Sequence, residues 1–401
     1  MKYETQVGII GAGPAGLMLS HLLHLNGISS IVLEAKSRAY CEERVRAGVL
    51  EQTAVEMMQD AGVGERLDRE GLIHHGIDLG LNGVRRRIAF TELTGRHVVV
   101  YGQQEAVKDL IARRLADGGD VRFECGEVSV HGFDGVHPSI RVRKDGSEDE
   151  IACDFIAGCD GFHGITRGAF PAGALTAYER AYPFAWLGIL AEAAPTREEL
   201  LYMHHDRGFA LYSMRSPKIT RLYLQCAPDE DIEQWSDDRI WNELHIRLRC
   251  ADGWLPGEGK ILQKGVTGMR SFVVEPLSYG RLYLAGDAAH IVPPTGAKGM
   301  NLALADVHYL NEGIKRFYAA NDTRGLESYS HTCLRRIWKA QRFSWWMTSL
   351  LHKFPDDSGF DQKRQRAELE YVMSSRAAST SLAENYVGLP LDGHSGWSIA
   401  S

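Results

Sequence analysis

Five side chains between residues 202 and 223 are of types that could bind a carboxylate. They are Tyr202, Ser213, Arg215, Arg221 and Tyr223. If they lie on strands, Ser213 and Arg215 share one face, and so do Arg221 and Tyr223, because side chains two residues apart point the same way. A buried arginine beside serine and tyrosine hydroxyls offers charge-assisted hydrogen bonds to a carboxylate. Paired side chains on a solvated sheet surface would give the same pattern, so the residues alone leave both interpretations open.

A second candidate site is the stretch from Gly286 to Asn301, which contains three glycines, the adjacent prolines Pro293 and Pro294, one Asp and one Lys. A short apolar run precedes it, and helical spacing begins near Met300. Glycines let the backbone approach a ligand closely, and a helix start leaves unpaired N–H groups. This combination suits an electron-rich, partly anionic ligand. An ordinary strand-to-helix loop stiffened by prolines is the other interpretation.

The N-terminus carries the glycine pattern of a dinucleotide site. Gly11, Gly13 and Gly16 follow the apolar run 6–10 and precede an amphipathic stretch, and a second apolar run ends at Glu34. In this strand, turn, helix and strand context the glycines make the turn, admit a pyrophosphate and allow close helix packing. Glu34 lies where an acid accepts the ribose hydroxyls of an adenosine.

Other polar residues could extend a phosphate site. Arg44 and Arg46 would point the same way on a strand and could meet pyrophosphate oxygens, although a solvated, salt-bridged loop would look alike. Asp160 and Gly161 follow a buried-strand run and suggest a second glycine turn near the first ligand. A hairpin is the alternative for this pair.

Composition narrows the class of protein. A net charge of −7 argues against a general nucleic-acid binder, whose affinity would rest on basic patches. The chain has no apolar run of about 18 residues and no basic segment followed by an apolar signal core, so we expect no membrane span and a cytoplasmic location. The seven cysteines never form a Cys-x-x-Cys pair, and the histidines show no ligand spacing. We therefore expect reduced thiols and no metal.

The expected fold is α/β and consists of three parts. Residues 1–177 are expected to form a Rossmann-like dinucleotide-binding domain, with a helix over 104–117 and a strand meander over 121–156. Residues 178–275 form an inserted, mostly antiparallel β-sheet domain that binds the substrate. Residues 276–401 hold the Gly286–Asn301 loop and a helical C-terminal region, with helices at about 303–320, 324–352 and 361–375 and a short ordered element at 384–390.

These motifs in this order resemble those of the FAD-dependent aromatic hydroxylases, the group A flavin monooxygenases. The glycine fingerprint, residues 44–52, residues 159–164, residues 286–296 and residues 384–390 carry the resemblance, which runs from residue 5 to about 390. Within that group, the set of Tyr202, Ser213, Arg215, Tyr223 and Tyr386 resembles the 4-hydroxybenzoate 3-monooxygenase family. The resemblance implies FAD, NAD(P)H and O₂ as reactants, 4-hydroxybenzoate as substrate, a flavin C4a-hydroperoxide as oxidant, a role in aromatic catabolism and a homodimer.

The resemblance also implies roles for individual residues. The FAD contacts would be Gly11, Gly13, Gly16, Glu34, Arg44, Arg46, Gln103, Asp160, Arg221, Asp287, Gly296, Lys298, Gly299 and Asn301. The substrate contacts would be Tyr202, Ser213, Arg215, Tyr223, Pro294 and Thr295. The catalytic groups would be Tyr202, Tyr386, the carbonyl of Pro294, and His74 at the end of a proton path. The NAD(P)H contacts would be Arg44, His163 and Arg270, and for the last two a structural hydrogen-bonding role stays open.

The chemistry suits these roles. A phenolate ring is more electron-rich than a phenol, and free phenols titrate near 10, so the site must favour the anion and give its proton an exit. Tyrosines and a histidine can relay that proton without leaving a charge beside the ring.

The resemblance leaves the nicotinamide cofactor and the reaction class open. The segment Glu34-Ala35-Lys36-Ser37-Arg38 lacks the arginine that follows the ribose-binding acid in typical members. We therefore expect NADPH but keep NADH as an alternative. A sister hydroxylase for another hydroxy- or aminobenzoate, and an FAD redox protein that inserts no oxygen, are the alternative functions.

Overall fold

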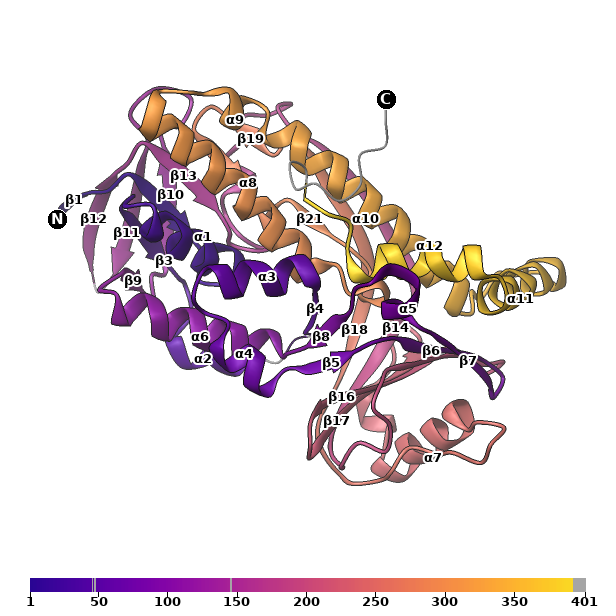
Figure 1. Ribbon diagram of the computed structural model, residues 1–401. Helices are drawn as coiled ribbons and strands as arrows, with labels where there is room; N and C mark the ends of the chain where they lie inside the picture. The colour runs from indigo at the N-terminus through magenta and orange to yellow at the C-terminus, as the bar shows by residue number, and fades with distance from the viewer. Residues whose placement is uncertain (45, 47, 145, 392–401) are drawn as a thin grey trace.

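The computed structural model describes residues 1–44, 46, 48–144 and 146–391 (Figure 1).

A parallel sheet forms the centre of the N-terminal half. Strand β2 (Val7–Ile10) is buried at every position and pairs in parallel with β3 and β13. A strand that is buried on both faces has a continuous apolar sequence, and the apolar run 6–10 predicts this strand for that reason. The six strands lie in the order β19 (Ser278–Tyr279), β20 (Leu282–Leu284), β13 (Phe155–Gly158), β2, β3 (Ser30–Leu33) and β9 (Asp120–Arg122).

Helices and a second sheet cover the two faces of this parallel sheet. Helix α1 (Pro14–Leu25) packs between α8 (Gly299–Ala320) and α6 (Gln103–Ala116). On the other face Ile140 approaches β2 so closely that a Cβ added to Gly8 would lie 2.3 Å from its Cδ1. That covering sheet has the order β1 (Lys2–Glu4), β12 (Ser147–Ala152), β11 (Ser139–Lys144) and β10 (Glu127–His131). The predicted Rossmann-like unit and its meander are confirmed.

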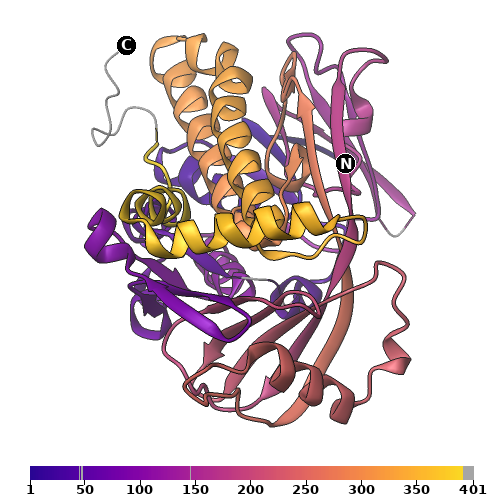
Figure 2. The same ribbon diagram turned by 90° about the vertical axis from the view of Figure 1, so that its right-hand side faces the viewer.

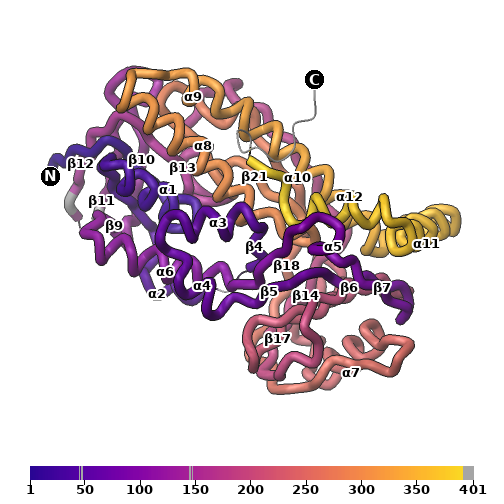
Figure 3. Tube along the Cα trace, viewed as in Figure 1, coloured from indigo at the N-terminus to yellow at the C-terminus, as the bar shows by residue number. Residues whose placement is uncertain are grey.

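The second half is built on an eight-stranded, mostly antiparallel sheet. Its order is β21 (His290–Ile291), β18 (Lys260–Glu275), β14 (Thr176–Glu192), β17 (Ile219–Cys226), β16 (Ala210–Ser216), β15 (Leu201–His204), β6 (Ile77–Leu81) and β7 (Val84–Ile88). The strands predicted within 178–275 are present. Three strands, however, come from outside that range: β6, β7 and β21. Figure 3 shows the purple trace of β6 and β7 along the edge of this sheet.

The mixed origin of the sheet corrects the expectation of one contiguous insertion. Strand β6 joins the sheet by parallel pairing with β15, with Leu79 opposite Tyr202. Alternation of side chains within a segment indicates a strand but does not reveal a partner more than a hundred residues away. The boundaries at 178 and 275 therefore describe where the chain enters and leaves most of the sheet, and not the whole sheet.

The two faces of the large sheet pack against different helices. On the outer face α7 (Asp237–Leu248) packs on β15 and β16 and completes an apolar core. On the inner face lie α5 (Phe90–Thr94), the end of α10 (Tyr329–Leu351), α11 (Gly359–Ser374) and α12 (Arg376–Val387) (Figures 1 and 2). Alternate residues of one strand therefore serve two separate cores.

The C-terminal region is helical, as expected, but its described residues form five helices instead of three. It contains α8, α9 (Arg324–Glu327), α10 (Tyr329–Leu351), α11 (Gly359–Ser374) and α12 (Arg376–Val387). The expected helix 324–352 is divided at Ser328, and the short element expected at 384–390 is the end of α12. Residues 392–401 lie outside the described residues.

Smaller elements join the two halves. A three-stranded sheet has the order β4 (Val49–Glu51), β8 (Val98–Val100) and β5 (Leu72–His74). The remaining helices and 3₁₀ turns are α2 (Arg38–Glu43), α3 (Gln52–Asp60), α4 (Glu65–Glu70), η1 (Arg167–Ala169), η2 (Ile232–Gln234), η3 (Gly286–Ala288) and η4 (Pro294–Gly296). Within the described ranges no helix is long and apolar enough to cross a bilayer, and no cluster of three or more His, Cys, Asp or Glu residues could hold a metal ion.

Candidate active site

The residues predicted to cradle a carboxylate lie on the inner face of the large sheet. Cross-strand pairing places Tyr202 beside Leu211, Leu211 beside Tyr223, and Ser213 beside Arg221. Tyr223 in turn lies opposite Gly188 of β14. A Cβ on Gly188 would be 2.7 Å from Nη2 of Arg221, so the glycine makes room for this guanidinium. The structure thus brings the predicted set together against the inner core rather than on the solvated surface.

The two arginines of this cradle have hydrogen-bonding capacity to spare. Arg215 donates from Nη1 to Oγ of Ser213 at 2.8 Å and to the carbonyl of Met214 at 2.9 Å. Among the described residues, Nε of Arg215 and Nη1 of Arg221 are buried without a hydrogen-bond partner. Buried, unpaired guanidinium groups are costly unless a ligand satisfies them. An anionic ligand, such as a carboxylate, fits this arrangement.

The cradle also acts on Tyr223. Burial alone would raise the pKa of this phenol, but the charges of Arg215 and Arg221 outweigh it and hold the pKa below its ordinary value. The guanidinium carbon of Arg221 lies 5.2 Å from the centre of the Tyr223 ring. The local potential is therefore positive, as a site for an aromatic acid requires.

A pair of buried tyrosines lies next to the cradle. The hydroxyls of Tyr202 on β15 and Tyr386 on α12 share a hydrogen bond of 2.6 Å. Burial raises the pKa of Tyr202 well above its ordinary value and raises that of Tyr386 to about 12. Both groups stay protonated near neutral pH, so each can donate one proton while it accepts another. The ring of Phe90 stacks on Tyr386 at 4.9 Å and fixes its orientation.

The predicted end of the proton path, His74, is fully buried at the end of β5. Neither of its ring nitrogens has a partner among the described residues. Burial lowers the pKa of His74 to about 4, with the charge of Arg215 acting in the same direction and that of Glu199 against it. A neutral imidazole with two free nitrogens can accept a proton. Its contact with Tyr386 stays a prediction.

The N-terminal glycines form a cradle that a side chain would fill. Gly11 has φ +106°, and a Cβ there would lie 2.2 Å from the carbonyl oxygen of Cys159. A Cβ on Gly16 would lie 2.0 Å from the carbonyl oxygen of Gly11, whereas the space at Gly13 is open. Gly13 also begins α1 without a side-chain cap, so the first N–H groups of the helix remain available. This geometry fits the pyrophosphate of FAD.

Glu34 and two arginines lie around this turn. The Glu34 carboxylate accepts hydrogen bonds of 2.8 Å from the backbone N–H groups of Ala12 and Lys36. Burial and the charge of Arg44 lower the pKa of Arg46, while the charge of the exposed Asp287 raises it, so both charged groups act on Arg46. These residues fit a dinucleotide cofactor. In the part of the chain that the structure describes, the strand on which the two arginines would share a face is not present: Arg44 is the C-cap of α2, and Arg46 precedes β4 without belonging to it, which agrees with the alternative of a loop.

The loop from Gly286 to Asn301 is shaped by contacts beneath it. The buried carboxylate of Asp306 accepts hydrogen bonds from the N–H of Gly286 at 2.9 Å and from Nε2 of His290 at 2.6 Å. Thr295 is fully buried and accepts a hydrogen bond of 2.9 Å from Thr348, whereas Pro294 is exposed. Buried contacts thus hold the loop at Gly286, His290 and Thr295, while Pro294 between them is exposed.

Comparison with known proteins agrees with this geometry. A family profile described as an FAD binding domain matches residues 4–344. The p-hydroxybenzoate hydroxylase of Acinetobacter baylyi is 46% identical over 390 residues, which cover 97% of this chain and 96% of that protein. The chain belongs to the FAD-dependent aromatic hydroxylase family.

More distant members share the fold. A 3-(3-hydroxy-phenyl)propionate/3-hydroxycinnamic acid hydroxylase of Paraburkholderia xenovorans is 27% identical over 77% of this chain and 49% of that protein. The crystal structure of p-nitrophenol 4-monooxygenase from Pseudomonas putida superposes with a TM-score of 0.81 at 15% identity, and covers 97% of this chain and 99% of that one. The second likeness supports the fold alone.

Several predicted cofactor residues use their side chains inside the protein. Lys298 donates to Oε1 of Glu51 at 2.5 Å and to the carbonyl of Tyr386 at 3.0 Å. The side chain of Asn301 bonds the backbone of Glu51, Val49 and Ala297. Asp160 accepts from the N–H and the hydroxyl of Thr166 at 2.9 and 2.6 Å. For these three residues, direct FAD contact stays a prediction that their side-chain contacts do not support.

Two other residues predicted to contact the cofactor, Gly296 and Gly299, differ in their surroundings. A Cβ on Gly296 would lie 2.8 Å from Oγ of Ser344, so this glycine permits close packing against α10. Nothing lies within 4 Å of the corresponding point on Gly299. Gln103 is the first residue of α6. Roles for Gln103 and Gly299 at FAD stay predictions.

The predicted NAD(P)H residues gather around one aromatic ring. The His163 ring lies 5.0 Å from the Phe162 ring, and the guanidinium of Arg270 lies 4.7 Å from the same ring. Arg167 packs on the opposite side of this group, 4.8 Å from both Phe162 and Phe272. Two of the predicted residues are thus together, and Arg44 is near Arg46 instead.

The sequence did not indicate several buried residues that contact the site residues and hold them in place. Trp186 on β14 donates from Nε1 to Nε2 of His352 at 2.6 Å, next to Tyr223. Glu51 binds both Lys298 and Arg336, and Asp306 binds His290. No spacing along the chain connects these pairs. The only signal was that one of them, Asp306 between Ala305 and Val307, is a charged residue within an otherwise apolar segment.

Proposed function

We propose that the protein is a 4-hydroxybenzoate 3-monooxygenase, which converts 4-hydroxybenzoate to 3,4-dihydroxybenzoate with NAD(P)H and O₂. The observation that carries the proposal is one sheet face that holds both an arginine cradle and a buried tyrosine hydroxyl. Ser213 and Arg215 lie two and four residues along β16 from Leu211, which pairs with Tyr202, and this is about 7–13 Å at the usual rise of a strand. A substrate with a carboxylate and a hydroxyl at opposite ends of one ring suits that arrangement. The 46% identical relative carries the name of this activity.

The protein's own groups then have distinct tasks. When bound, FAD supplies electrons from NAD(P)H and the activation of O₂. Arg215, Ser213 and Tyr223 bind the substrate carboxylate and fix the position of the ring. The phenol hydrogen-bonds Tyr202, which passes the proton to Tyr386 and on toward His74. Loss of that proton makes the ring more electron-rich and therefore easier to hydroxylate.

Exclusion of water is the other task of the protein. Trp186, Leu211 and Phe209 line the same sheet face and are buried. The Pro294 carbonyl and Thr295 would close the site from the loop. A dry site prevents the oxidant from decaying to hydrogen peroxide before it meets the ring.

A direct test follows NADPH and NADH oxidation with and without 4-hydroxybenzoate and identifies the product. We expect 4-hydroxybenzoate to accelerate oxidation and 3,4-dihydroxybenzoate to accumulate. Arg215→Ala should abolish the acceleration at low substrate, since each lost charge-assisted hydrogen bond costs roughly 1.5–3 kcal/mol. Lys218→Ala, in the exposed turn between β16 and β17, is the matched control.

The possible outcomes separate the alternatives. Acceleration by another hydroxy- or aminobenzoate, with its hydroxylated product, would indicate a sister hydroxylase. Bound FAD without any response to aromatic acids would indicate a redox protein that inserts no oxygen. Comparing NADPH with NADH decides the cofactor, for which Lys36, Arg38 and Arg44 supply positive charge. The homodimer and the cytoplasmic location remain predictions.

A further inference from the structure

We propose that Glu199, held in place by Arg87, is a positioning residue that draws the substrate proton outward through His74. The inference deepens the proposed function and rests on it. Tyr202 and Tyr386 are 2% and 1% exposed and His74 is not exposed at all, so a proton that reaches His74 has not yet left the protein. We infer that Glu199, an acidic group that acts on His74, decides whether the proton leaves the protein.

His74 lacks the partners that a structural histidine has. Both of its ring nitrogens are buried without a hydrogen bond among the described residues. Its neighbour His75, by contrast, bonds the hydroxyl of Thr91 at 2.9 Å, and His290 bonds Asp306. Buried polar groups without partners are rare and call for an explanation. A transient proton acceptor needs this freedom, because its nitrogens must exchange partners.

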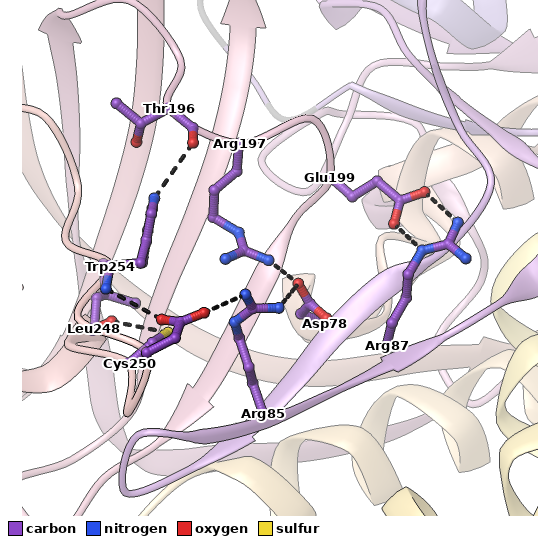
Figure 4. Close-up of polar contacts among 10 residues, drawn as sticks. Asp78, Arg85, Arg87, Thr196, Arg197, Glu199, Leu248, Cys250 and Trp254 are labelled. Carbon is purple, nitrogen blue, oxygen red and sulfur yellow. Dashed lines mark hydrogen bonds and ion pairs between the residues drawn. The ribbon is translucent and has the colours of Figure 1, made fainter.

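Glu199 lies two residues before β15 and pairs with Arg87. Its two carboxylate oxygens accept from Nε and Nη2 of Arg87 at 2.7 and 2.8 Å, as Figure 4 shows. The Glu199 side chain is 15% exposed, whereas that of Arg87 is 43% exposed. The carboxylate therefore faces the protein, and the guanidinium faces water.

The backbone links Glu199 to the segment that carries His74. Asp78 on β6 donates its N–H to the carbonyl of Leu200 at 2.8 Å. Gly76, between His74 and β6, lies against Arg87, because a Cβ there would be 3.2 Å from its Nε. The glycine leaves room for the ion pair beside the histidine segment.

A neighbouring cluster keeps the Glu199 segment rigid. Arg197 and Arg85 both bind the buried carboxylate of Asp78, and the Arg197 guanidinium lies 4.8 Å from the centre of the Trp254 ring (Figure 4). Glu199 follows Arg197 by two residues, so the contacts of Arg197 also hold the backbone that carries Glu199. Its position relative to His74 does not depend on a mobile loop.

The charges around His74 oppose each other across it. Glu199 favours its protonated form, while Arg215 on the substrate side and His75 disfavour it. On the outer side Glu199 faces Arg87, His74 and His75, and Arg87 also lies 3.9 Å from Glu92. His75 has the ring of His97 at 5.8 Å. The negative charge of Glu199 thus favours a proton on His74, whereas the positive charge of the arginine cradle opposes it.

Two substitutions at the ion pair test the proposal because they break the same contact with opposite electrostatic effects. Glu199→Gln removes the negative charge, so we expect the pKa of His74 to fall further and ionisation of bound 4-hydroxybenzoate to slow at least threefold. Arg87→Met leaves the carboxylate unneutralised, so we expect the pKa of His74 to rise by up to about one unit and ionisation to be no slower. Glu198→Gln, an exposed neighbour, is the control.

The readouts are NMR of histidine-labelled protein across pH, with His74→Gln to assign the signal, and stopped-flow absorbance of the bound phenolate. If the ion pair only supported the fold, both substitutions would change the two readouts in the same direction or not at all, and the proposal would be overturned. The NMR titration needs no turnover. It therefore decides the role of Glu199 even if the substrate proves to be another aromatic acid.

Discussion

At the scale of single residues, the alternation of side chains along β15 and β16 separates chemistry from support. Tyr202 points to the inner face and bonds Tyr386, whereas Tyr212 points to the outer core and accepts a 2.7 Å hydrogen bond from the N–H of Thr196. Both tyrosines are almost fully buried. They differ in which face they occupy, and the two-residue period of a strand decides that.

Replacing each tyrosine by phenylalanine should separate the two roles. Tyr202→Phe removes the first hydroxyl of the proton path, so we expect hydroxylation to fall by about 100-fold, a usual range for loss of general acid–base help. NAD(P)H oxidation should continue with release of hydrogen peroxide. Product and peroxide assays in the same reaction measure this change in coupling.

The matched control is Tyr212→Phe. It leaves the N–H of Thr196 without its partner and should lower the free energy of unfolding by about 1 kcal/mol without altering the ratio of product to peroxide. Unchanged coupling in Tyr202→Phe, or equal uncoupling in both variants, would remove Tyr202 from the proton path.

At the scale of elements, local patterns predicted more than long-range ones. The β2 run, the Gly11–Gly16 turn, Glu34 and the start of α8 depend on neighbours within one supersecondary unit, so their spacing carried the information. The Tyr202, Ser213 and Arg215 set needed the strand period and a resemblance to a family.

Other features could not be read in this way. The pairing of β6 with β15 and the contact of Lys298 with Glu51 join segments that are distant in sequence. The resemblance implied a cofactor contact for Lys298, which stays a prediction. The packed structure adds that its ammonium group binds Glu51 and the carbonyl of Tyr386 near the end of α12.

The buried Glu51 network gives a test at this scale. Lys298 and Arg336 both bind Glu51, and Arg336 also donates to the carbonyls of Leu389 and Pro390. Glu51→Gln leaves the buried ammonium of Lys298 without its counter-charge. Since breaking a buried pair costs about 3–5 kcal/mol, we expect a loss of that size in urea unfolding.

The double variant Glu51→Gln with Lys298→Met should recover part of the loss, because it removes the unpaired charge. Glu56→Gln on the exposed side of α3 is the control. Additive losses in the double variant would show that the two side chains act independently.

At the scale of the whole molecule, α10 couples the two halves. Its first turns contribute Tyr329, Cys333 and Ile337 to the core around the parallel sheet, and its last turns contribute Phe343 and Met347 to the core that surrounds the tyrosine pair. The helix ends at the buried His352. The cofactor half and the substrate half therefore share one rigid element.

His352 makes the stability of that junction depend on pH. Its Nδ1 donates to the carbonyl of Thr348 at 3.0 Å, so its Nε2 is the acceptor for Trp186 and the ring is neutral. Burial lowers the pKa of His352 from 6.5 to about 3. A folded-state pKa below that of the unfolded chain contributes stability that is fully present above pH 6.5 and is lost as the pH falls toward 3.

His352→Gln keeps an acceptor for Trp186 but does not titrate. At pH 7 the variant should be less stable than the natural protein, and the difference should shrink by about 1.4 kcal/mol for each unit below pH 6.5. Urea unfolding at pH 7, 6 and 5 measures this, with the exposed His137→Gln as control. A difference that stays constant over this range would mean that His352 is not held neutral, and that the acid sensitivity of the junction arises elsewhere.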